Sequence, residues 1–300
     1  MEYKNKAGKP ASTPPPLNHE GLERFARRAW SAVADLFLLR ECASCRRLLY
    51  PGKMRSSFPG YKKASGLTGS TLKIIAIVLM FIDHIGAVIV EQGILKAPAI
   101  VSDPSLWEKI RQIDRILRTL GRPAFPIFCF LLVEGFIHTH NQRSYALRLL
   151  AFSLISEIPF DLAIYGHLWY PQKQNVFFTL LIGLLVMMAC SRFRNNVWLQ
   201  VGFLALGLFA GYILKTDYGY KGVLLLEVLY LLRFDKRIQA LGGAAAISWE
   251  RAAPLAFLPI LFYNGQRGIS LKYFFYWFYP LHLLLFYLGR ILLNVWGGIF

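Results

Sequence analysis

The chain has 300 residues, of which 55% are hydrophobic and 15% aromatic, and its mean hydropathy is +0.41. These values exclude an ordinary soluble domain, because the apolar residues come in long blocks instead of periodic stripes. The excess of 34 Lys and Arg over 17 Asp and Glu does not by itself indicate nucleic-acid binding, since membrane proteins gather basic residues in cytoplasmic loops. We therefore expect an all-α, polytopic bundle of transmembrane helices that binds no nucleic acid.

Residues 1–69 are predicted to form a cytoplasmic extension ahead of this membrane domain. Residues 1–16 are polar and rich in proline, which is typical of disorder, and residues 17–40 have the pattern of a basic amphipathic helix followed by a basic linker. Cys42 and Cys45 have CxxC spacing, but no second Cys or His pair follows nearby, so we expect no metal site there. We expect no cleavable signal sequence, and we expect the first span to direct insertion.

About eight membrane spans, within a range of seven to nine, are expected in the domain at residues 70–300, since a spanning helix needs about 20 apolar residues. Residues 96–121 alternate charged and aliphatic side chains and predict a short surface helix. Glu250 and Arg251 interrupt the seventh span, which we interpret as one span with an internal ion pair or a break; two half-helices are the alternative. The expected spans are 72–94, 123–138, 145–166, 175–191, 197–214, 219–233, 240–263 and 273–296.

The distribution of basic residues predicts the orientation of the bundle. The amino-terminal region and the short turns at 139–144, 192–196 and 233–237 are basic, and all fall on one side if the amino terminus is cytoplasmic. The segment at 96–121 also carries basic residues and would lie on the opposite side. We expect a cytoplasmic amino terminus.

The first span, LKIIAIVLMFIDHIGAVIV, carries three ionisable residues. Lys73 lies at its start, and Asp83 and His84 lie in its interior. A charged side chain at mid-bilayer costs roughly 2.5–3.5 kcal/mol, so such residues mark a functional site. Lys73 and His84 are eleven residues apart, which places them on one helix face about 16 Å apart along the axis. We predict a cation at the membrane edge and a titratable imidazole near mid-bilayer.

The predicted topology brings further polar side chains to the depth of His84. Glu157 and Asp161 belong to the third span, which we expect Pro159 to break. His282 also falls near mid-bilayer, in the eighth span. We expect these three residues to be neighbours of His84, and the alternative is that they form structural pairs elsewhere.

Basic residues are also predicted at the cytoplasmic mouth of the bundle. Lys73, Arg148 and Arg143 can neutralise the phosphate groups of an anionic donor there. Glu134 in the second span lies near the same edge and can pair with Lys73 or Arg148.

These groups fit two kinds of chemistry. A mid-membrane imidazole can accept a proton from an attacking nucleophile, and a carboxylate such as Asp83 would hold its tautomer. This suits a transferase whose donor and acceptor enter from opposite faces. It also suits a proton-coupled transporter with Asp83, His84 and Glu157 as relay groups. The chain shows no internal repeat and no matched pair of broken spans, which favours the transferase.

Six stretches of the chain together resemble the TraX family, in the expected order across residues 72–290. They are LKIIAIVLMFIDHIGAV, GRPAFPIFCFLLVEGFIHT, RLLAFSLISEIPFDLAIYG, NVFFTLLIGLL, YNGQRG and KYFFYWFYPLHLLL. Several long segments that agree in order are more specific than one short motif. Residues 1–66 lie outside the resemblance.

The resemblance implies a bacterial inner-membrane acetyltransferase that uses cytoplasmic acetyl-CoA, because TraX proteins are linked to amino-terminal acetylation of F pilin. The wider acyltransferase-3 group shares a first-span motif of a basic residue, ten residues and a His, which Lys73 and His84 match. His84 is thereby implied as the catalytic residue, as general base or transient acetyl carrier, and Lys73 as a cation for the donor. The acceptor would be an amine or hydroxyl, on a pilin, another peptide or an extracytoplasmic glycan.

We assign the remaining roles from depth and chemistry. Catalytic roles are expected for His84, Asp83, Glu157 and Asp161, donor binding for Lys73, Arg148 and Arg143, and acceptor binding for His282, Glu134 and Asn264. We expect no metal, and an oligomer is compatible with the sequence. The alternatives are a proton-coupled transporter and a non-catalytic membrane component of a pilus or conjugation apparatus.

Overall fold

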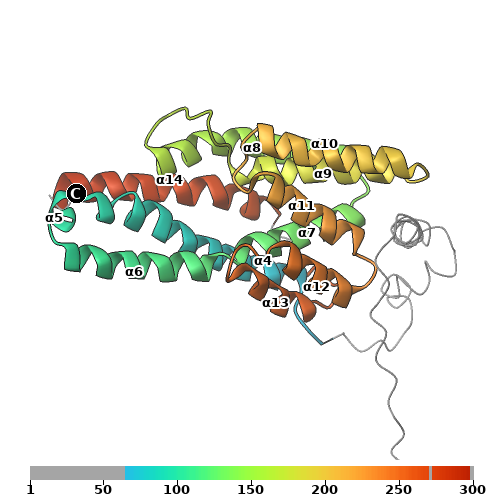
Figure 1. Cartoon of the computed structure of the whole chain (residues 1–300), viewed down its shortest axis with the longest axis horizontal. Coiled ribbons are helices and arrows are strands. Elements are labelled where there is room, and N and C mark those ends of the chain that lie inside the picture. Colours follow the sequence, from blue (N-terminus) through green and yellow to red (C-terminus); the bar gives the residue numbers. More distant parts are fainter. Residues whose placement is uncertain (1–64, 270–271, 298–300) are drawn as a thin grey trace, which may run out of the picture. The chain divides into compact units, whose positions relative to one another are not determined.

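The computed structural model of the chain describes residues 65–269 and 272–297. This part is all-helical, with two isolated β-bridges and no strand (Figure 1). The predicted disordered segment, the amphipathic helix at 17–40 and the Cys42–Cys45 pair lie outside the described residues.

The first predicted span is helical and changes from α-helix to π-helix directly after His84. Helix α4 (Gly69–His84) begins where Thr68 caps it, its hydroxyl accepting from the N–H of Thr71. Directly after His84 the chain continues as the π-helical segment η1 (Ile85–Glu91). π-helical turns are rare and occur frequently at functional sites.

The surface helix that the sequence predicts within 96–121 is present, and it is longer than expected. After the short helices η2 (Ile94–Lys96) and α5 (Pro98–Val101), the segment forms the 18-residue helix α6 (Pro104–Gly121). This helix runs alongside α4 and η1 and packs against both (Figure 1). Its charged pattern reflects an amphipathic helix that packs one face on the first span.

The next five predicted segments are helices whose bounds agree with the prediction to within a few residues. The helices are α7 (Ala124–His138), α8 (Gln142–Tyr165), α9 (Val176–Arg192), α10 (Val197–Ile213) and α11 (Gly219–Leu231). In α8 one prediction is wrong, because the helix is not broken at Pro159 and continues through it. Prolines are tolerated inside such helices where neighbouring groups and local adjustments satisfy the freed backbone groups.

The break that the sequence allowed in the seventh predicted span is present. The chain forms α12 (Lys236–Ala246), a non-helical stretch, and then η3 (Ala253–Ala256) and α13 (Phe257–Leu261). Glu250 in the break forms an ion pair with Arg122 instead of Arg251. The helix predicted at 273–296 is confirmed as α14 (Lys272–Gly297).

Helix α7 is central to the packing. It contacts α4, α9, α11, η3 and α13, and its Ile127, Cys129 and Val133 are fully buried. Helix α14 packs against α8 and η1, and it lies beside α4 (Figure 1). The predicted neighbourhood of the first and eighth spans is therefore confirmed.

Two helical stretches of the described residues, Gly69–Lys96 and Pro104–His138, are long and apolar enough to cross a membrane. Helices α9 and α10 are apolar but shorter. The number of spans and their orientation stay predictions.

Gly121 allows α6 to approach α4 at the site. A Cβ atom on Gly121 would lie 2.2 Å from Cβ of Asp83 and 2.8 Å from its Cα. We expect Gly121→Ala to destabilise the protein by about 1–3 kcal/mol, because the backbones must separate. Thermal unfolding in detergent tests this against Gly202→Ala, whose added Cβ meets nothing within 4 Å. Equal unfolding temperatures for the two variants would contradict the close contact.

Candidate functional site

Two cavities lie on either side of a shared aromatic wall. The first, of about 280 Å³, is lined by His84 and is called the histidine cavity. The second, of about 550 Å³, is lined by Lys73, Arg148 and Arg267 and is called the cation cavity. Phe128 of α7 lines both. Lys73 and His84 therefore occupy one helix but face different cavities.

His84 is held by a second imidazole. Its Nδ1 lies 2.6 Å from Nε2 of His282 in α14, and Nδ1 of His282 lies 2.6 Å from the carbonyl oxygen of Phe278. Because a carbonyl only accepts, His282 donates from Nδ1, and its Nε2 then accepts from the Nδ1–H of His84. In the neutral ring this leaves Nε2 of His84 as a proton acceptor.

This geometry corrects the predicted orienting group. The sequence favours Asp83 or a third-span carboxylate beside His84, but Asp83 accepts from Arg118 at 2.6 Å, and His282 binds the imidazole. His282 is almost fully buried and lines neither cavity, so its place is behind His84 and differs from the acceptor-binding role predicted for it.

Glu157 and Asp161 are not brought to His84. Glu157 accepts from the side-chain amide of Asn175 at 2.5 Å and from its backbone N–H at 3.2 Å. Asp161 accepts from the backbone N–H of Tyr170 at 2.7 Å. Both carboxylates therefore tie α8 to the connection before α9, and neither lines a cavity. Similar depth along separate helices did not mean contact.

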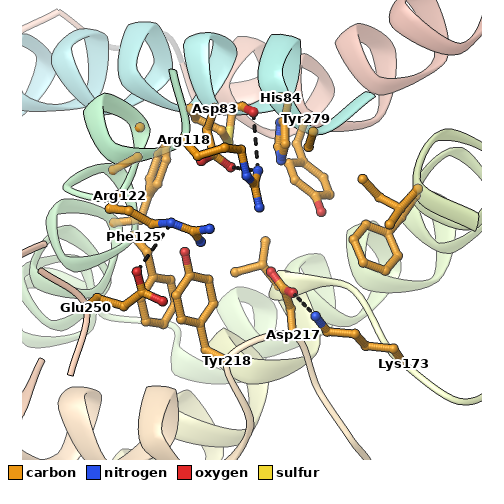
Figure 2. Close-up of a pocket in the computed structure, with 18 of the residues that line it drawn as sticks. Asp83, His84, Arg118, Arg122, Phe125, Lys173, Asp217, Tyr218, Glu250 and Tyr279 are labelled. Atoms are coloured by element: carbon orange, nitrogen blue, oxygen red, sulfur yellow. Dashed lines mark hydrogen bonds and ion pairs between the residues drawn. The ribbon is translucent and has the colours of Figure 1, made fainter. Parts of the chain in front are cut away.

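Three ion pairs surround the histidine cavity, and of their six members the sequence indicated only Asp83 for the site. They are Arg118–Asp83 at 2.6 Å, Arg122–Glu250 at 3.3 Å and Lys173–Asp217 at 3.0 Å (Figure 2). Arg118 and Arg122 come from the end of α6, which the sequence presents as a surface segment. The available signal was their spacing of four residues, which places them on one helix face.

The cation cavity contains most of the residues predicted for donor binding. Lys73 and Arg148 line it as expected, with the Lys73 ammonium 5.1 Å from the ring centre of Phe275. Glu134 also lines this cavity, together with Lys73 and Arg148, the two residues with which we expected it to pair. Arg267 adds a third cation that the sequence analysis did not single out, although it belongs to the YNGQRG stretch.

Arg143 and Asn264 line neither cavity. Arg143 is exposed in the first turn of α8. The side-chain amide of Asn264 donates to the carbonyl of Gly66 at 3.2 Å, and the loop that follows accepts from the first N–H groups of α4, those of Gly69 and Ser70. Asn264 therefore braces the start of α4, which differs from the predicted acceptor contact.

The site as a whole separates two chemical capacities. The histidine cavity offers a proton acceptor among paired charges, and the cation cavity offers three positive side chains against one carboxylate. The second arrangement favours an anionic ligand.

Comparison with known proteins identifies the family. A model described as TraX protein matches residues 68–290. A protein of Dichelobacter nodosus named "Probable fimbrial assembly protein FimC, serogroup H1" is 32% identical over 246 residues, which cover 71% of this chain and 92% of the relative. No solved structure gives a significant match. The chain belongs to the TraX protein family.

Proposed function

We propose that this TraX protein is a membrane acetyltransferase that moves the acetyl group of acetyl-CoA to an amine or hydroxyl acceptor. The observation that carries the proposal is that Lys73 and His84 of one helix line two cavities with Phe128 as their common wall. Coenzyme A carries its phosphates at one end and its thioester at the end of a long pantetheine arm. A separation of about 16 Å between a phosphate-binding cation and a base suits that shape.

In the proposed reaction the donor phosphates bind Lys73, Arg148 and Arg267, and the arm passes Phe128 toward His84. Nε2 of His84 takes the proton of the acceptor as its nitrogen or oxygen attacks the thioester carbonyl. The C–S bond then breaks, and the proton passes to the departing sulfur to give free CoA. His282 keeps the tautomer throughout, because His84 donates from Nδ1 both before and after protonation.

Family membership and the name of the Dichelobacter relative support a role in the assembly of pili or fimbriae. We propose the amino terminus of a pilus subunit as an acceptor of this kind. The same name favours a second candidate, a non-catalytic membrane component of the assembly apparatus. In both cases we place the chain as a multi-pass protein of the bacterial inner membrane, with the cation cavity toward the cytoplasm.

Replacement of His84 tests the catalytic assignment. Purified protein supplied with acetyl-CoA and acceptor peptides should release free CoA, and His84→Ala should lower this rate by about 100-fold or more, because the general base is lost. The exposed His167→Ala is the matched control and should keep the wild-type rate. Full activity in His84→Ala would refute the assignment, and uptake driven by a pH gradient without need for acetyl-CoA would indicate a transporter. An assembly component would tolerate His84→Ala in a piliation assay.

Replacement of His282 tests the tautomer argument. His282→Leu removes the acceptor for Nδ1–H of His84, and we expect kcat to fall by about 10- to 100-fold while the KM for acetyl-CoA changes little. His282→Gln offers an amide oxygen in its place and should recover part of the lost kcat. Equal kcat values for the two variants would show that His282 only fills space.

Replacement of Lys73 tests the donor end. Lys73→Gln should raise the KM for acetyl-CoA by about 10-fold, since one charged contact with phosphate is lost. S-acetylpantetheine lacks the nucleotide phosphates, so its KM should not change. Arg143→Gln is the control, because Arg143 lies outside the cation cavity. A larger effect of Arg143→Gln than of Lys73→Gln would contradict the donor site described here.

A further inference from the structure

Arg118 and Arg122 present their guanidinium groups to the same space beside His84. Figure 2 shows both groups pointing toward the middle of the histidine cavity. Arg118 belongs to α6, and Arg122 is the C-cap residue directly after this helix. Their side chains are 24% and 26% exposed, so both are partly withdrawn from solvent.

The carboxylates that pair with these arginines fix them from the wall of the cavity. Asp83 accepts from Nη1 of Arg118 at 2.6 Å, and Glu250 lies 3.3 Å from Nε of Arg122. Nη1 of Arg118 also donates to the backbone carbonyl of Asp83 at 3.2 Å, and Arg122 also hydrogen bonds the side chain of Tyr218. A guanidinium has three nitrogen atoms and five N–H donors, so these contacts use a part of its donors. The pairing therefore holds each planar group in place while its far end points inward (Figure 2).

The remaining charges in the cavity do not compete for this position. Asp217, from the connection before α11, is bound to Lys173 at 3.0 Å, so this pair is neutral as a unit. Arg118 and Arg122 are each neutralised by a carboxylate, so an anion would bind here through the N–H donors that these pairs leave over and not through a net positive charge. Planar guanidinium groups match the geometry of carboxylate and phosphate oxygens.

We infer that Arg118 and Arg122 form an anion subsite beside His84, and that the acceptor carries a carboxylate or phosphate close to the amine or hydroxyl that is acetylated. This inference deepens the proposed function. Its statement about the acceptor rests on the proposed transferase activity. The subsite lies in the histidine cavity, across Phe128 from the cations of the donor site, and so serves the other substrate.

Matched acceptor pairs test the charge requirement. Glycylglycine and glycylglycinamide differ by a carboxylate, and phosphoethanolamine and ethanolamine differ by a phosphate. We expect the anionic member of at least one pair to show a kcat/KM for CoA release about 10-fold higher or more, and the favoured pair identifies the anion. Equal or better use of both neutral members by the wild-type protein would overturn the inference.

Variants of the subsite locate the preference. Arg122→Gln should abolish the higher kcat/KM of the anionic acceptor. Arg122→Lys keeps the positive charge but lacks the planar guanidinium group, and it should retain part of this preference. Arg115→Gln is the control, because Arg115 lies on the same helix, is 59% exposed and pairs with Glu108. Retention of the full preference in Arg122→Gln would overturn the subsite. Arg122 is preferred to Arg118 for this test because Arg118 neutralises Asp83 next to His84.

A binding measurement separates the subsite from the transferase activity. Inorganic phosphate should raise the thermal unfolding midpoint of the detergent-purified Lys73→Gln protein, in which the donor site is weakened. Adding Arg122→Gln should remove this rise, and adding Arg115→Gln should not. A rise that does not depend on Arg122, or no rise, would overturn the subsite. An Arg122-dependent rise without CoA release from any acceptor would instead sustain the subsite and refute the transferase.

Discussion

The hydrogen bond between His84 and His282 is the interaction on which the site depends. It joins α4 to α14 across 198 residues of sequence, at the point where α4 gives way to the π-helical η1. The carbonyl of Phe278 sets the donor and acceptor roles of both rings. A backbone group thus determines which nitrogen of His84 can act as a base, and no carboxylate is required for that purpose. This differs from the Ser-His-Asp arrangement, in which an acid holds the tautomer.

The second constraint is the separation of charge between the two cavities. Lys73, Arg148 and Arg267 line the cation cavity, where we propose that the anionic donor binds, and the charges around His84 are paired. In a low-dielectric bundle, an unpaired charge next to the base would be costly, whereas a paired one can be kept in place. Phe128 lies between the two environments. The two cavities therefore offer chemically different surroundings and share one side chain in their walls.

Interruptions of regular helix shape the candidate site. The break after α12 lets Glu250 reach Arg122, and the close contact at Gly121 brings the end of α6 against Asp83. The loop around Asn264 binds the first N–H groups of α4 and so supports the helix that carries both Lys73 and His84. An unbroken seventh span would have left Arg122 without this partner.

The sequence by itself determined the all-helical class and the ends of most helices, and it indicated Lys73 and His84 as candidate site residues. These follow from local information, since apolar runs define helices and an eleven-residue spacing defines a helix face. It also placed His282 near His84, because depth along two spans limits which residues can meet. Only the tertiary structure decided which side chains touch: depth leaves rotation about each helix axis free, so Glu157 and Asp161 turned to backbone groups of a neighbouring loop. Arg118, Arg122 and Glu250 entered the site through the packing of α6 and the break after α12, and no local pattern specifies such contacts between distant segments.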